Sequence, residues 1–161
     1  LGVFSSQGIP FIFAGEEMYR SKLGEKNTYN LPDKYNAIDW SLKSQYANLV
    51  EYHKGLIAMR KAHPAFAMGD AELLREHLSF IENENSAALG FVLDNLETID
   101  PAKRIVVLMN GSRESVEFDI PAGNYTILAD GDRVNVEGLG TCNSDGTITL
   151  NPVEGVVLAA F

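Results

Sequence analysis

The chain of 161 residues lacks several features that would assign it to a class at once. Cys142 is its only cysteine, so no disulfide can form within the chain. No apolar run reaches the roughly 18 residues that a membrane-spanning helix needs. Acidic residues outnumber basic ones by 22 to 13, which gives a net charge of −9. We therefore expect no membrane insertion, and the charge argues against nucleic acid or an anionic membrane surface as partners.

Motifs for metal or nucleophilic catalysis are also missing. The three histidines do not have the spacing of metal ligands. Two Asp- and Asn-rich segments, 130–132 and 143–146, do not fit an EF-hand loop and are predicted to be hairpin turns. No Ser-His-Asp arrangement can be argued from the sequence, and Cys142 has no recognisable catalytic partner motif. We expect no metal site and no cofactor in these residues.

The first residues do not resemble a natural start. They contain neither an initiator Met nor the basic segment of a signal peptide. Residues 1–5 are predicted to complete a helix that begins earlier. We expect the chain to be a piece of a longer protein, and the sequence leaves its compartment unknown.

Residues 7–40 are the most informative stretch. An apolar run, Ile9–Ala14, stops at Gly15 and is followed at once by Glu16 and Glu17. A run without polar alternation is typical of a strand buried on both faces of a parallel sheet. In a parallel barrel, the loop after such a strand carries ligands and chemistry. We therefore interpret 18–40 as a loop at an active-site rim.

The composition of this loop suits sugars, which present hydroxyl groups at their edges and apolar C–H groups on their faces. The loop mixes planar donors and acceptors with aromatic rings, at Tyr19, Arg20, Asn27, Tyr29, Asn30, Asp33, Tyr35, Asn36 and Trp40. The alternative is a solvated surface loop that a few aromatic side chains anchor.

A helix is predicted next, over 44–63, because its apolar residues recur with a period of 3.6. Pro64 ends it. Gly55 in its middle costs about 1 kcal/mol relative to Ala, and a close approach to a neighbouring strand would explain it.

After Gly69 the period changes to two, which predicts short strands. We expect strands over 77–82, 87–93, 104–109, 115–119, 124–128, 133–136, 147–150 and 156–161. Turn sequences rich in Gly, Asn and Asp separate several of them. Strands at this spacing favour an antiparallel sandwich.

Several motifs occur in an order that resembles the α-amylase superfamily (glycoside hydrolase family 13), and within it type I pullulanases. The motifs are Gly8-Ile9-Pro10, Ala14-Gly15-x-Glu17, Asn27-x-Tyr29, Asp33, Asn36, Asp39-Trp40 and Arg60-Lys61-Ala62-His63-Pro64-Ala65-Phe66. They cover about the first forty percent of the chain. The resemblance implies an α+β fragment: the last strand, loop and helix of a TIM-type (β/α)8 barrel in 1–66, then an antiparallel all-β sandwich in 67–161.

The resemblance also implies a function. The intact protein would hydrolyse α-1,6 linkages in pullulan or branched α-glucans with retention of configuration. Its catalytic carboxylates would come from barrel strands before Leu1, so we assign no catalytic residue here and expect the fragment to be inactive. Glu16 and Glu17 are a tempting pair, but adjacent side chains at a strand end point in opposite directions. Glu17 is expected to brace the barrel rim.

Asp33 and Asn36 fall where members of the family contact sugar, and Asn27 and Tyr29 are weaker candidates of the same kind. The alternative for Asp33 is a turn that its own side chain stabilises. Trp40 could be a platform for a sugar ring, but we expect it to be a buried anchor.

The implied partners are an α-glucan and the upstream part of the same protein. An apolar strand and helix without the rest of a barrel would also favour self-association. One alternative is an α-amylase or neopullulanase that cleaves α-1,4 bonds. Another is that the sandwich acts as a carbohydrate-binding module, but its aromatic residues lie mostly in apolar strand positions and are expected in the core: Phe80, Phe91, Phe118, Tyr125 and Phe161. Large glucans lie outside cells, so secretion is weakly favoured.

Overall fold

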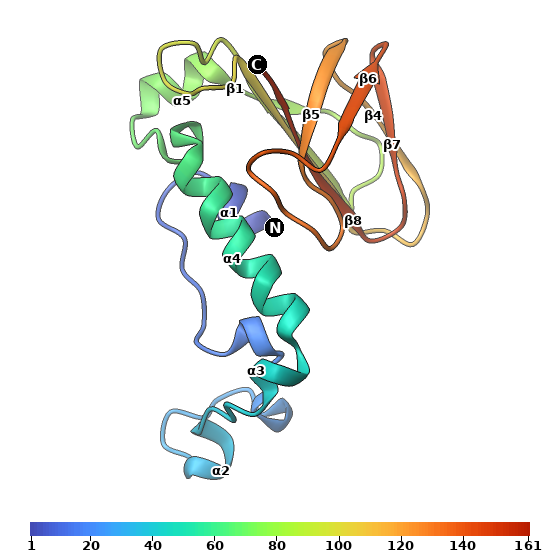
Figure 1. Ribbon diagram of the computed structural model, residues 1–161. Coiled ribbons are helices and arrows are strands. Elements are labelled where there is room, and N and C mark those ends of the chain that lie inside the picture. The colour runs from blue at the N-terminus through green and yellow to red at the C-terminus, as the bar shows by residue number, and fades with distance from the viewer.

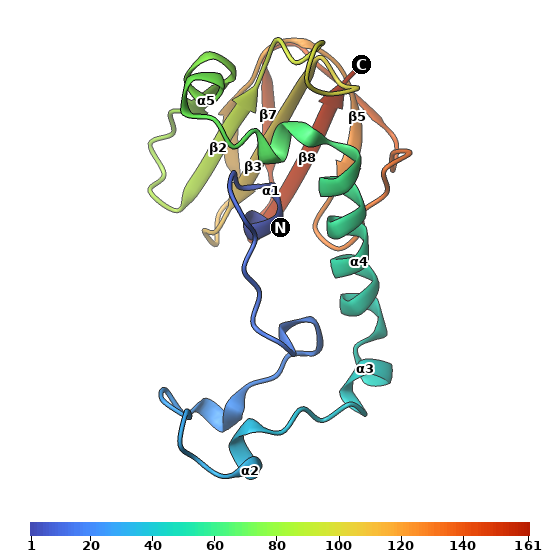
Figure 2. The same ribbon diagram turned by 90° about the vertical axis from the view of Figure 1, so that its left-hand side faces the viewer.

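A computed structural model describes residues 1–161, and it shows two parts of different shape. The second half of the chain is a β-sandwich, and the first half is a long arm that extends away from it (Figures 1 and 2). The longest helix, α4, runs from the sandwich to a cluster of loops at the far end of the arm (Figure 1). None of the helices has the length and apolarity that crossing a membrane requires.

The arm contains short helical segments around one long helix. They are α1 (Gly2–Ser5), η1 (Glu16–Met18), η2 (Lys22–Gly24), α2 (Asp33–Asn36), α3 (Leu42–Gln45), α4 (Ala47–Ala62) and η3 (Pro64–Ala67). The predicted helix over 44–63 is confirmed, although its first turn is separated from α4 at Tyr46, where φ is −113° and ψ is 40°. A further helix, α5 (Ala71–His77), was not expected; the Asp70 carboxylate caps it by accepting hydrogen bonds from the N–H groups of Glu72 and Leu73.

Eight strands follow, all of them antiparallel to their neighbours: β1 (Leu78–Ile81), β2 (Ala88–Leu93), β3 (Arg104–Asn110), β4 (Val116–Asp119), β5 (Gly123–Ala129), β6 (Thr141–Ser144), β7 (Thr147–Leu150) and β8 (Glu154–Ala160). Six form one sheet in the order β1-β2-β3-β8-β5-β6, and β4 and β7 form a second. All of the predicted strands are present except the one over 133–136. The strand β6 was not predicted, and its last two residues fall in the predicted turn over 143–146.

The large sheet is buried on both faces. Alternate residues of β3 separate into two clusters, with Ile105 and Val107 on one face and Val106 and Leu108 on the other. The first cluster also contains apolar side chains of the arm: Phe4, Leu56, Met59, Ala65 and Phe66. The second lies between the large sheet and the β4–β7 pair. The arm and the sandwich therefore share one core, and the division at residue 66 stays a prediction.

Gly55 explains how the arm packs on the sandwich. A Cβ built on Gly55 would lie 2.7 Å from the Cβ of Val134. Val134 lies in the segment 133–136, which was predicted to be a strand. The structure shows only an isolated bridge there, between Val134 and Ala129. The alternating Val134 and Val136 are packed against the arm-side cluster from a loop. Their period of two reflects burial against the helix and not a strand.

The predicted strand over Ile9–Ala14 is absent from this structure. The residues form no ladder with any other segment, and the Ile9 and Phe11 side chains are 96% and 87% exposed. A strand exists through its hydrogen bonds to neighbours, and these 161 residues supply none beside this run. The structure shows antiparallel sheets with a few helices, and the barrel origin of 1–66 stays a prediction.

Two expectations about aromatic residues are also wrong. Phe91, Phe118 and Tyr125 are buried as expected, but Phe80 and Phe161 are mostly exposed. Trp40, expected to be a buried anchor, is 65% exposed, because the end of the arm packs against too little of this chain to cover an indole ring.

Candidate functional site

The candidate site is the loop at the far end of the arm, residues 13–42 (Figures 1 and 2). Its backbone is unusual, because Tyr19, Lys22 and Leu23 have φ values of +56°, +48° and +54°. Residues other than Gly rarely adopt this left-handed conformation, and it persists only where surrounding contacts fix it. The backbone of the loop is therefore held in an unusual shape, although the Tyr19 and Leu23 side chains are 65% and 63% exposed.

A tight turn opens the loop at Gly15, where φ is +99°. The N–H of Gly15 donates to the Glu17 carboxylate over 3.0 Å. Glu17 thus stabilises the turn that precedes it. Glu16 faces elsewhere and lines a different hollow, together with Leu1 and His53. The two adjacent carboxylates therefore do not converge on one point.

Arg20 connects the two ends of the loop. Its guanidinium donates to the carbonyl of Ala14 over 3.0 Å and to the carbonyl of Asn36. The cation also lies 5.0 Å from the centre of the Phe13 ring. Sequence reasoning placed Arg20 only among the polar residues of the loop and did not foresee this role.

The four predicted sugar-binding residues differ in the exposure and hydrogen bonding of their side chains. Asp33 opens α2 with an exposed side chain. The Asn36 side chain is engaged, since its amide N–H groups donate to the carbonyls of Thr28 and Leu31 over 2.7 and 2.8 Å. Asn27 and Tyr29 are exposed on either side of the buried Thr28. The structure thus brings Asn36 to the segment that bears Asn27 and Tyr29, and leaves Asp33 open to solvent.

A hollow of about 290 Å³ lies beside these residues and is lined in part by Tyr19, Arg20, Lys34, Tyr35 and Asp39. Sequence reasoning listed the tyrosines and Arg20 as loop residues but did not propose Lys34 or Asp39 as site residues. The hydroxyl and N–H of Ser41 donate to Asp39 and lower the pKa of its carboxyl group. The hollow therefore offers cations, one carboxylate and two aromatic rings within a small area.

The Arg60–Phe66 motif forms the joint between the arm and the sandwich. Arg60 donates to the carbonyls of Phe4 and Ser6 over 2.8 and 2.7 Å, and also to that of Gly8. Gln7 makes a second clamp, because its amide donates to the carbonyl of Ala65 over 2.6 Å. These residues, which carried much of the resemblance, hold the chain segment before the loop.

His63 and Asp100 complete this joint in the interior. Nδ1 of His63 lies 2.8 Å from Oδ1 of Asp100, and both residues are more than nine-tenths buried. The same carboxylate accepts from the N–H groups of Ala65 and Ala102. Burial opposes its ionisation, but the hydrogen bonds from His63 and the two N–H groups outweigh burial and hold the pKa of Asp100 below its usual value.

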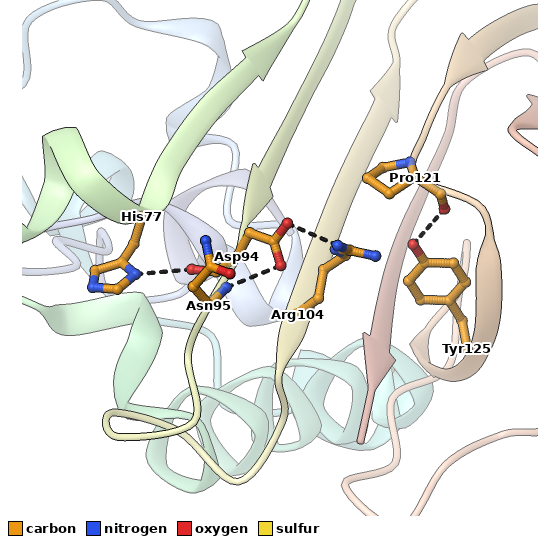
Figure 3. Close-up of polar contacts among 6 residues, drawn as sticks. All are labelled: His77, Asp94, Asn95, Arg104, Pro121 and Tyr125. Atoms are coloured by element: carbon orange, nitrogen blue, oxygen red, sulfur yellow. Dashed lines mark hydrogen bonds and ion pairs between the residues drawn. The ribbon is translucent and has the colours of Figure 1, made fainter.

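A separate polar network closes one end of the sandwich (Figure 3). The His77 ring donates to the Asp94 carbonyl over 2.8 Å, and Arg104 donates to the Asp94 carboxylate over 2.8 Å. The Tyr125 hydroxyl donates to the carbonyl of Pro121 over 2.6 Å. The two contacts of Asp94 tie α5, the end of β2 and β3 together. No cluster of three or more potential metal ligands occurs in residues 1–161.

Comparisons with known proteins agree with the sequence motifs. Residues 74–133 match the family described as the pullulanase all-beta domain. A pullulanase of Bacillus subtilis is 34% identical over 129 residues, which are 80% of this chain and 18% of the relative. An isoamylase of Flavobacterium is 33% identical over 135 residues, which are 72% of this chain and 17% of the relative.

The structure gives the same result. A pullulanase from Anoxybacillus sp. LM18-11, solved in complex with maltotetraose, superposes with a TM-score of 0.85 at 30% identity, over 99% of this chain and 22% of that chain. The chain is therefore similar to enzymes of the glycosidase class. Within that class, it is similar to pullulanases and isoamylases, and it spans about a fifth of the length of these relatives.

Proposed function

We propose that the chain is the C-terminal part of an α-glucan debranching enzyme of glycoside hydrolase family 13, which hydrolyses α-1,6 linkages in pullulan or branched α-glucans. The observation that carries the proposal is the superposition over 99% of the chain, because it includes the arm as well as the sandwich. The family match alone covers only the residues 74–133.

In this proposal, residues 1–66 are the last strand, loop and helix of a TIM-type barrel, and 67–161 are the sandwich that follows it. The exposed Ile9 and Phe11 support this, since neighbouring barrel strands would pair with and cover such a run. Alone, the same surface favours self-association of the 161-residue chain.

The catalytic carboxylates are proposed to lie outside these residues, in a retaining mechanism. Retaining glycosidases need two carboxyl groups about 5 Å apart on opposite sides of the scissile bond. Glu16 and Glu17 line different hollows, and Glu17 is bound to its own turn. The chain itself is therefore expected to be inactive.

The loop at the end of the arm is proposed to contact the glucan. Asp33 can accept hydrogen bonds from sugar hydroxyls, and Tyr29, which is 85% exposed, can lie against a sugar face. Asn27 and the remaining amide oxygen of Asn36 are further contacts. The sandwich is proposed to pack and not to bind glucan, because three of its five aromatic residues are in its interior and only Phe80 and Phe161 are exposed.

The test is the release of reducing sugar from pullulan, measured for the purified 161-residue chain and for the longer polypeptide that carries it. We expect activity only in the longer polypeptide, with maltotriose as the product. Products from α-1,4 cleavage would favour an α-amylase or neopullulanase instead. Activity in the 161-residue chain would show that catalytic carboxylates lie within it, and Glu16, Glu17, Asp33 and Asp39 would be replaced first.

A further inference from the structure

Arg20 occupies a central position in the loop at the end of the arm. Its backbone N–H donates to the carbonyl of Gly15 over 3.0 Å. Its guanidinium then reaches the carbonyl of Ala14 at the start of the loop and that of Asn36 near the end. One side chain therefore spans residues that are 22 positions apart in the sequence.

The surroundings of Arg20 hold its side chain in this position. The Phe13 ring lies under the guanidinium, with its centre 5.0 Å from the guanidinium carbon. Gly15 is also close to this side chain, since a Cβ built on Gly15 would lie only 2.7 Å from the Arg20 Cδ. The absence of a side chain at Gly15 therefore makes room for Arg20. Two features thus favour glycine at this position, the positive φ and the space that Arg20 occupies.

The contact between Arg20 and Asn36 lies beside the predicted sugar-binding residues. Asn36 accepts from Arg20 through its backbone and donates through its side chain to Thr28 and Leu31. Asp33 lies at the start of α2, which Asn36 ends. Arg20 thus fixes Asn36, and Asn36 fixes both α2 and the 28–31 segment.

We propose that Arg20 is a positioning residue for glucan binding, which acts through the backbone of Asn36 and holds Asp33 and Asn36 in place. The inference rests on the proposed function, because it takes Asp33 and Asn36 as sugar contacts. A planar guanidinium can donate to two carbonyls in different directions, whereas the ammonium of a lysine is a single centre on a flexible stem. Charge alone is therefore insufficient at this position.

The first test measures amide hydrogen exchange in the 161-residue chain. Arg20→Met is expected to speed exchange in 26–37 about tenfold, while the amides of β3 and β8 stay unchanged. Lys26→Met, which removes an exposed cation from the same loop, is the control and should leave exchange unchanged. Arg20→Lys should restore only part of the protection. Exchange in Arg20→Met within twofold of the unaltered chain would overturn the proposal.

The second test uses pullulan hydrolysis by the longer polypeptide. Arg20→Met is expected to raise KM about tenfold with kcat changed less than twofold, and millimolar methylguanidinium should partly restore the KM of Arg20→Ala. An unchanged KM in Arg20→Met, beside a raised KM in Asp33→Ala, would overturn the positioning role. If Asp33→Ala and Asn36→Ala both leave KM unchanged, the proposed sugar contacts are wrong. The positioning role of Arg20 in glucan binding is then wrong as well. The exchange result would still show that Arg20 orders the loop.

Discussion

His63 and Asp100 form a buried pair, with 2.8 Å between Nδ1 and Oδ1, at the point where α4 meets the sandwich. Asp100 lies between β2 and β3, and His63 is the residue that follows α4. The carboxylate also accepts from the N–H groups of Ala65 and Ala102. One side chain therefore satisfies buried donors from two parts of the fold.

Asp100→Asn is expected to destabilise the chain by about 3 kcal/mol, since breaking a buried pair leaves its other partner unsatisfied. The amide keeps the shape of the carboxylate but loses its charge and one acceptor atom. Urea unfolding would measure the change in the free energy of unfolding. Asp145→Asn, in an exposed turn, is the control and should change it by less than 0.5 kcal/mol. Equal stability of the two variants would show that the pair does not hold the joint.

The stability of the chain should fall in acid. Asp100 and Asp94 both have folded-state pKa values below the ordinary value, in each case because hydrogen bonds outweigh the opposing effect of burial. A depressed pKa gives stability that is fully present above the unfolded value of about 4 and is lost as pH falls through the folded value. Urea unfolding between pH 7 and pH 2.5 should show the decrease below about pH 4. Asp100→Asn should have a shallower decrease, and an identical pH profile would contradict this assignment.

The sandwich was predictable because its signals are local. Alternating apolar residues and turn sequences define most strands to within two residues. The Gly55 anomaly correctly indicated a close neighbour, but that neighbour is a loop and not the expected strand. Where prediction was wrong, the deciding contacts were distant. Val134 and Val136 have the period of a strand but pack against the arm-side core from a loop. The continuous apolar run of Ile9–Ala14 looks like that of β3, yet only β3 has neighbours to pair with.

The candidate site was predictable only in composition. The sequence indicates that polar and aromatic residues gather between 18 and 40, but it does not show which of them are already engaged. Asn36 and Glu17 both use their side chains within the loop. Arg20 could not be singled out, because its partners are backbone carbonyls and have no sequence signature.

Arg60→Met is expected to release the first eight residues from the end of α4. The variant loses three hydrogen bonds to the carbonyls of Phe4, Ser6 and Gly8 and keeps much of the apolar stem. Limited proteolysis should cleave the segment around residues 5–10 several times faster than in the unaltered chain. Lys61→Met removes the adjacent, exposed cation and serves as the control. If both variants are cleaved at the same rate, Arg60 does not clamp the segment.

Gly55→Ala should destabilise the chain even though it improves helix propensity. In an isolated helix the change would stabilise by about 1 kcal/mol. Here the new methyl group would lie 2.7 Å from the Val134 Cβ and 3.2 Å from the Val134 carbonyl oxygen, so α4 or the 130–140 loop must shift. Such overpacking costs about 1–3 kcal/mol, and we expect a net loss of about 1 kcal/mol in urea unfolding. In a double-mutant cycle with Val134→Gly, the double variant should be more stable than the sum of the single effects predicts, because glycine lacks the Cβ that makes the closer of the two clashes. A stabilised Gly55→Ala variant, or additive effects in the cycle, would show that the helix and the loop are not in tight contact in solution.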